Sequence, residues 1–246
     1  MKDQIIEILR NSEEINFQDF YTDNYDALEE LLRNELPQNA KVSFDSGISK
    51  VVILIAGENY VLKIPFVKMF DEDSYNSDVA YWDSGEWEGE EEYSEPNIEN
   101  YFSNFEWAES DKVSTSNNWD YCALECAFYE IATERGLEQY FAKEELYAVV
   151  LDHPVYIQER VTPLEASEKS ISYEQAETTR KRCSDLSVRC FNPKWVTDFF
   201  NCYGEQEFIK LSNFLEEMKI YDLHEGNLGY LYGAPVLLDY SDFREW

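Results

Sequence analysis

The sequence predicts an α+β fold of two lobes, and three observations support that prediction. A helical pattern near the N-terminus is followed by three strand-like segments separated by glycine-containing turns, which is typical of consecutive antiparallel strands. After residue 120, a helical pattern leads into a strand pair. The rest of the chain is helical until a last short hairpin, so strands dominate the first part and helices the second.

The expected elements can be placed in chain order. Helices are expected within residues 1–38 and over 123–135, 172–188 and 205–219. Strands are expected at 41–45, 50–56, 60–64, 147–151, 155–161, 228–231 and 236–238. A hinge between the lobes is expected near Val161–Leu164.

Hydrophobic spacing supports the individual helices. In the first segment, Leu28, Leu31 and Leu32 fall at i, i+3 and i+4, and Pro37 ends the pattern. Three further positions that share one face, followed by a glycine at the expected C-cap, predict the helix after residue 122: Leu124, Phe128, Ile131 and Gly136. A buried stripe predicts the last helix: Phe208, Leu211, Leu215 and Met218. The strand at 50–56 is apolar after Lys50, so we expect cover on both of its faces.

The charge of the chain excludes some classes of partner. Asp and Glu number 51 against 20 Lys and Arg in 246 residues, which gives a formal charge of −31. Direct binding to nucleic acid or to an anionic membrane would need clustered basic residues, so neither is expected. A disordered acidic chain is also excluded, because 16% of the residues are aromatic.

Much of this charge lies in one segment. Residues 71–120 hold 16 acidic residues and a single basic one, Lys112, together with Trp82, Trp87, Trp107 and Trp119. We interpret about 69–119 as an acidic, aromatic-rich insertion that is partly folded onto the domain. Its tryptophans favour a solvated excursion held by its aromatics or, in a sharper hypothesis, a docking surface for a protein partner.

Cysteine usage and hydropathy indicate a cytoplasmic protein. Five cysteines form no C-x-x-C pair, which favours reduced thiols: Cys122, Cys126, Cys183, Cys190 and Cys202. The N-terminus lacks the apolar core of a signal peptide. The apolar run 51–56 is too short to span a bilayer.

The strongest chemical motif lies near the C-terminus. Asp222 and Asn227 stand five residues apart in a loop, and Asp239 follows a hairpin that turns back toward them. Their hard oxygens suit Mg²⁺, which completes its coordination with phosphates and water. Asn227 and Asp239 are the candidate metal ligands.

This motif resembles the protein-kinase-like superfamily. The stretch Asp222-Leu-His-Glu-Gly-Asn227 is similar to the catalytic loop of that family, and is closest to the aminoglycoside-phosphotransferase type. Asp239 matches the metal-binding Asp of the D-F-G motif, although Tyr240-Ser241 replaces Phe-Gly. The resemblance implies a small antiparallel-sheet N-lobe, a helical C-lobe, and ATP and Mg²⁺ as cofactors.

The same resemblance assigns roles upstream. Tyr60-Val-Leu-Lys63 is similar to the lysine strand, so Lys63 would meet the α/β-phosphates, with Glu125 as its helix partner and Glu130 as a competitor. Asp222 would accept a proton from the substrate hydroxyl. Residues near the nucleotide would include Gly47 and Ser49 in the first turn, backbone groups at Glu159–Val161 against the adenine edge, and His224 on the phosphate side.

The sequence departs from the family pattern at several positions, and these departures predict a smaller C-lobe. Only Gly47 stands where a glycine-rich loop is expected, and Tyr221 replaces the Arg before the catalytic Asp. Few residues follow Asp239, so a reduced C-lobe without an activation segment is expected. We therefore expect an N-terminal helical segment over 1–38, an N-lobe with its insertion over 39–161, and a reduced C-lobe over 162–246.

Two functions remain open from the sequence. The first is an ATP- and Mg²⁺-dependent kinase-like phosphotransferase that acts on an unidentified hydroxyl acceptor. The alternative is a catalytically inactive kinase-fold binding module, or an acidic nucleic-acid mimic, that engages a basic protein partner through the insertion.

Ordinary structural roles also remain open for the site residues. Lys63 could be a solvent-facing strand lysine, and Glu125 a solvated helix residue. Asp222 and Asn227 could satisfy local backbone groups, and His224 could pack in a core.

Overall fold

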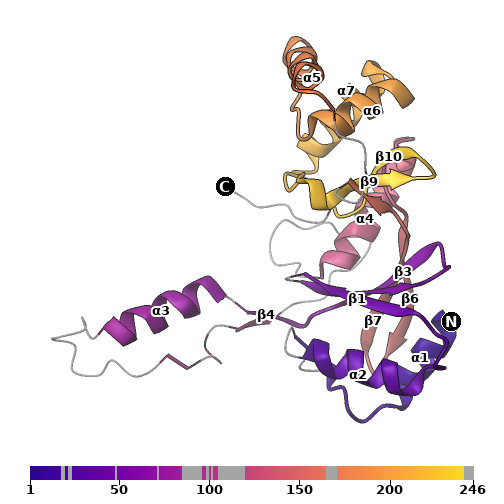
Figure 1. The fold of residues 1–246 in the computed structure, drawn as a ribbon, viewed down its shortest axis with the longest axis vertical. Helices are drawn as coiled ribbons and strands as arrows, with labels where there is room; N and C mark the ends of the chain where they lie inside the picture. The colour runs from indigo at the N-terminus through magenta and orange to yellow at the C-terminus, as the bar shows by residue number, and fades with distance from the viewer. Residues whose placement is uncertain are drawn as a thin grey trace.

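The computed structural model describes residues 1–17, 20–21, 24–47, 49–70, 72–84, 96–97, 100, 102–104, 120–164 and 171–240. Its fold is α+β, as predicted (Figure 1). The helices are α1 (Lys2–Asn11), α2 (Tyr25–Glu35), α3 (Glu72–Ser84), α4 (Tyr121–Glu134), α5 (Tyr173–Asp185), α6 (Pro193–Cys202) and α7 (Glu205–Glu217), with 3₁₀ turns η4 (Glu138–Tyr140) and η6 (Glu225–Asn227). The strands are β1 (Val42–Ser46), β2 (Lys50–Ile55), β3 (Tyr60–Pro65), β4 (Lys68–Phe70), β5 (Phe102–Asn104), β6 (Glu144–Val150), β7 (His153–Glu159), β8 (Thr162–Pro163), β9 (Leu228–Leu231) and β10 (Ala234–Leu237).

A five-stranded antiparallel sheet organises the first part of the chain. Its strand order is β1-β2-β3-β7-β6, so β7 and β6 join the edge of the β1–β3 meander. Helices α1 and α2 cover one face of this sheet, where their apolar sides meet alternate residues of β2 and β3 (Figure 1). Val51, Ile53 and Ile55 point into that core and are at most 2% exposed.

The prediction that β2 is covered on both faces is wrong for part of the strand. Val52 and Leu54, which alternate with the buried residues, are only half-buried. Helix α4 lies against the opposite face and contacts β3 and β6, so cover there is centred away from β2. The strand is apolar in sequence, but its two faces have different environments.

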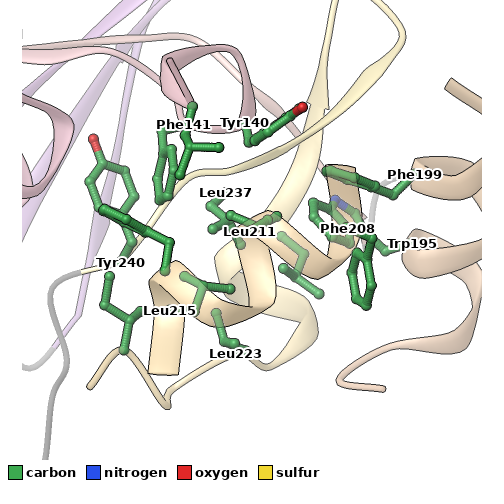
Figure 2. Packing of buried hydrophobic residues seen from close by; sticks show 14 of the residues in the cluster. Tyr140, Phe141, Trp195, Phe199, Phe208, Leu211, Leu215, Leu223, Leu237 and Tyr240 are labelled. Atoms are coloured by element: carbon green, nitrogen blue, oxygen red, sulfur yellow. The ribbon is translucent and has the colours of Figure 1, made fainter. Parts of the chain in front are cut away.

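A second core joins helices α6 and α7 to the C-terminal hairpin. Trp195, Phe199 and Phe208 pack together at one end of this core, and Phe141 meets Tyr240 at the other (Figure 2). The Trp195 indole also donates a hydrogen bond to the Gly229 carbonyl oxygen at 3.1 Å. These contacts hold the β9–β10 hairpin in place.

Two elements in this region are absent from the sequence-based expectation. Asn192 caps the start of helix α6: its side chain accepts from two backbone amides, and Pro193 follows as the first helical residue. That cap and proline are ordinary helix-start signals that the prediction passed over. Thr162 and Pro163, expected in a hinge, instead form β8 and pair with β9 in the three-stranded sheet β10-β9-β8.

The described part of the acidic insertion is small. It contains α3 and the β4–β5 pair, and Figure 1 shows α3 extending away from the five-stranded sheet. Trp82 is half-buried, whereas Trp87, Trp107 and Trp119 lie outside the described residues. The prediction that the insertion is partly folded onto the domain therefore concerns mostly residues that lie outside the described part of the chain.

No disulfide joins any of the five cysteines, all of which lie among the described residues. No helix among the described residues is long and apolar enough to cross a membrane.

Candidate functional site

Lys63 and Glu125 form a buried ion pair between the sheet and α4. The Lys63 Nζ lies 2.5 Å from Glu125 Oε2, and the two side chains are 3% and 0% exposed. Lys63 faces α4 because strand alternation turns it away from the core that contains Leu62 and Ile64. Glu130, the competing partner in the sequence, is exposed on the same helix.

Three further polar residues complete this buried cluster. Glu144 Oε2 on β6 lies 2.6 Å from Lys63 Nζ, and Gln158 on β7 donates to that same oxygen at 2.9 Å. Lys50, at the start of β2, contacts Glu125 and also reaches Asp239 at 3.0 Å. None of these three residues was identified from the sequence. We refer to Lys50, Lys63, Glu125, Glu144 and Gln158 as the lysine cluster.

Strand register contains the signal that could have revealed Lys50. Val52 is paired with Lys63 in the β2–β3 ladder, and Lys50 lies two residues earlier on the same face. A lysine at this position therefore points toward α4 with Lys63. Glu144 was missed for another reason, because β6 begins three residues before the strand that the sequence predicted.

Electrostatics within the lysine cluster keep both lysines charged. Burial alone would lower the pKa of Lys63, but Glu125 and Glu144 outweigh it and raise that pKa. Asp239 and Glu125 do the same for Lys50, whose pKa lies well above its ordinary value. Burial, followed by the charge of Glu144, raises the pKa of Glu125. The cluster is therefore a site where opposing charges are held out of water.

The loop before β9 brings Asp222, Asn227 and His224 together. The Asn227 Nδ2 donates to the Asp222 backbone oxygen at 2.8 Å and to its carboxylate at 3.2 Å. His224 Nε2 lies 3.6 Å from Asp222 Oδ2, and its Nδ1 accepts from the Gly226 amide. Asp222 and His224 remain substantially exposed, with side chains 41% and 59% accessible.

The β9–β10 hairpin connects this loop to the lysine cluster. The Leu238 amide donates to the Asn227 carbonyl oxygen at 3.0 Å, which closes the hairpin onto the loop. Gln158 Nε2 donates to the Leu238 carbonyl oxygen at 2.8 Å, and the next residue, Asp239, meets Lys50. Lys63, Glu125, Asp239, Asn227, Asp222 and His224 thus belong to one connected set of polar contacts.

The remaining nucleotide-binding candidates stand apart from that set. Gly47 lies in the β1–β2 turn, where its amide donates to the Lys50 carbonyl oxygen. The Ser49 carbonyl oxygen accepts a hydrogen bond from the Phe66 amide. Near the expected adenine edge, the Glu159 amide donates a hydrogen bond to the Lys143 carbonyl oxygen. The Arg160 amide donates to the Asn59 carbonyl oxygen. The Val161 side chain packs beside Gly229. These positions carry no side-chain bond to the lysine cluster within the described residues.

The donor chemistry near Asp239 suits a divalent cation. Asn227 uses its amide NH₂ group on Asp222, which orients its carbonyl oxygen as an acceptor, and Asp239 already receives a cation in the form of the Lys50 ammonium. Within the described residues, no group of three or more His, Cys, Asp or Glu side chains is arranged to hold a metal ion. A metal at this position would therefore bind through one carboxylate and one amide oxygen, in competition with Lys50.

A second buried pair fixes the start of α4. Asp120 caps the helix by accepting from the Ala123 amide at 3.0 Å, and Tyr156 on β7 donates to its other oxygen at 2.6 Å. Burial raises the pKa of Asp120 to about 6, although these hydrogen bonds act in the opposite direction. The pair sets the position of α4, and with it the position of Glu125, against the sheet.

No protein-family model matches the chain, and no curated protein matches its sequence. The geometry of the site is therefore the basis on which a function can be assigned.

Proposed function

We propose that the chain is a kinase-like domain that binds the phosphates of ATP and transfers a phosphoryl group to a hydroxyl acceptor. The observation that carries this proposal is the buried Lys63–Glu125 pair, connected through Lys50 and Gln158 to Asp239 and the Asp222–Asn227 loop. A strand lysine held by a helix glutamate, together with an Asp-to-Asn loop and a later Asp, is the set of residues that protein kinases use for phosphoryl transfer.

The order of elements supports a two-lobed kinase-like fold. An antiparallel sheet of order β1-β2-β3-β7-β6 has α4 inserted between β3 and β6, and the polar loop precedes a hairpin that ends at Asp239. In this proposal, the five-stranded sheet with α4 corresponds to the small lobe. Helices α5–α7 and the three-stranded sheet correspond to a reduced large lobe.

Five residues of the connected set have a role in the proposed reaction. Lys63, fixed by Glu125, would hold the α/β-phosphates of the nucleotide. Asp222, with its exposed carboxylate, would accept the proton of the attacking hydroxyl. Asn227 and Asp239 would hold Mg²⁺, which when bound neutralises charge on the phosphates.

Charge explains why a cation must accompany the nucleotide. Three carboxylates, those of Glu125, Glu144 and Asp239, face the two lysines Lys50 and Lys63, so the set has a formal excess of one negative charge. ATP would add further negative charge at a site in a protein whose formal charge is −31. Nucleotide binding is therefore expected to require a divalent cation.

One observation favours a second function, that of a kinase-like binding module without phosphotransfer. The Lys50 ammonium lies 3.0 Å from Asp239, where the proposed metal would have to bind. If this ion pair persists, Asp239 stays neutralised and Mg²⁺ gains little by binding there. The two functions therefore differ in the behaviour of one ion pair.

A thermal-shift and phosphoryl-transfer experiment separates them. We expect Mg-ATP to raise the Tm of the wild type and of Asp185→Asn, a matched change of an exposed carboxylate on α5, but not the Tm of Asp239→Asn. Asp222→Asn should keep the rise in Tm and lose transfer of the labelled γ-phosphate.

The other outcomes are equally informative. A rise in Tm that Asp239→Asn leaves unchanged, without any phosphoryl transfer, would support the non-catalytic module, in which Lys50 keeps the metal away from Asp239. No Mg-ATP-dependent rise in the wild type would reject the nucleotide-binding proposal.

A further inference from the structure

An open pocket of about 360 Å³ lies beyond the lysine cluster, where the end of α4, turn η4, the end of β7 and the β9–β10 hairpin meet. Aromatic rings from Tyr129, Tyr203, Tyr232 and Phe141 form much of its lining. Two carboxylate residues, Glu138 and Glu159, complete it. The pocket thus combines π-faces with negative charge.

Glu138 supplies the chemical asymmetry of this pocket. Its Oε2 atom is buried, and among the described residues no hydrogen-bond donor reaches it. A buried carboxylate oxygen without a donor is destabilising unless a ligand or water compensates for it. Glu159 differs, because its carboxylate accepts from the Lys143 amide at 3.0 Å.

Lys143 acts on this pocket, but its ammonium is paired with a carboxylate outside the pocket lining. The Lys143 ammonium is bonded to Glu145 at 2.5 Å, on the neighbouring strand β6. Burial, and then the charge of Glu159, raise the pKa of Tyr129 against the opposing charge of Lys143, with smaller contributions from Glu138 and Glu145. The hydroxyl of Tyr129 thus lies in a predominantly negative environment, which is also what a cationic ligand would encounter.

The end of the pocket at the hairpin turn is distant from the candidate phosphate site, although Val236, which also lines the pocket, lies three residues before Asp239. Tyr232 lies in the turn of the β9–β10 hairpin, whereas Asn227 and Asp239 lie beside its open end. Four residue pairs of the ladder stand between them, which corresponds to about 10 Å or more along the strands. Of the residues proposed for nucleotide binding, only Glu159 borders the pocket.

We propose that this pocket binds a small organic cation of the alkylammonium class. The ring faces would attract the cationic head. The Glu138 carboxylate, whose Oε2 accepts no hydrogen bond among the described residues, would supply the negative charge that balances the cation. The formal charge of −31 would raise the local concentration of such cations. Glu159 borders both this pocket and the expected adenine edge, but binding of a cation here does not depend on phosphotransfer.

Calorimetric titration with choline tests the proposal, with dimethylbutanol, its uncharged carbon analogue, as the matched ligand. We expect saturable binding of choline and at least about tenfold weaker binding of the uncharged analogue. Glu138→Gln and Tyr232→Leu should each weaken choline binding by about tenfold or more. Glu134→Gln, an exposed change on α4 outside the pocket, should leave binding unchanged.

Tyr232 makes the test robust against misfolding, because its side chain is 85% exposed and its replacement leaves the core intact. Titration with N-acetyl-lysine methylamide distinguishes the source of the cation. Tighter binding of this compound than of choline would identify a lysine side chain as the ligand, whereas tighter binding of choline identifies a free alkylammonium. Equal binding of choline and its uncharged analogue, or no saturable binding of either cation, would overturn the proposal.

Discussion

Removing the Glu125 carboxylate is the most direct test of the lysine cluster. In Glu125→Ala, Lys50 and Lys63 lose their shared partner while they remain 7% and 3% exposed at their side chains. Glu144 and Asp239 can still pair with them, but each lysine loses a contact and a cavity forms in a fully buried position. Breaking a buried ion pair in this way costs about 3–5 kcal/mol of unfolding free energy. That is a large fraction of the total stability of a typical domain.

Urea denaturation of the wild type, Glu125→Ala and Glu130→Ala measures this loss. Glu130 lies on the same helix and is exposed, so Glu130→Ala should change the free energy of unfolding by no more than about 0.5 kcal/mol. Glu125→Gln keeps the shape of the side chain and removes its charge, so it isolates the electrostatic part of the loss. Equal stability of Glu125→Ala and Glu130→Ala would refute the assignment of a buried network.

Three further predictions concern stability. Burial lowers the pKa of His153 to about 4, so the unfolded chain takes up a proton below about pH 6.5 and the folded chain does not. Stability should therefore fall by about 3 kcal/mol between pH 6.5 and 4 in the wild type relative to His153→Gln, measured by urea titration. Burial raises the pKa of Asp120 to about 6, so protonation of Asp120 increases stability as the pH falls. This effect is the same in the wild type and in His153→Gln, and the comparison removes it. Gly229→Ala would place a Cβ 2.4 Å from the Val161 side chain, so a loss of about 1–3 kcal/mol is expected in urea, and full stability would contradict the packing. Leu211→Ala should lower the free energy of unfolding by about 2–5 kcal/mol in the same assay, since its side chain is fully buried among α7 and its neighbours; a loss below 1 kcal/mol would contradict that burial.

Local pattern was sufficient to predict most of the elements. Strand alternation and glycine turns identified β1, β2 and β3 to within one or two residues, because those signals act over a few neighbouring positions. The short strand β8 was missed for a physical reason. Thr162 and Pro163 have no strand pattern of their own, and their pairing with β9 depends on residues more than sixty positions away.

The candidate site was predictable only where a motif spans few residues. The Asp222–Asn227 step and the lysine strand are local patterns, and the pairing of Lys63 with Glu125 followed from the family resemblance. Lys50 and Glu144 take part through strand register and the packing of α4, which no single window of sequence contains. In the sequence, Lys50 looks like an ordinary residue at the start of a strand; only the fold brings it next to Glu125 and Asp239.

The content of the lysine cluster itself argues for a chemical role. Stability alone does not require such a network, because replacing a whole buried set of ion pairs by apolar residues is often neutral or stabilising. The chain has only 20 basic residues, yet Lys50 and Lys63 lie together in one buried cluster with Glu125 and Glu144, and Lys50 also contacts Asp239. A second lysine is not needed to hold Glu125, but it does bring a positive charge to Asp239. The position of Lys50 therefore makes the occupancy of Asp239, by lysine or by a metal, the step on which catalytic and non-catalytic function would divide.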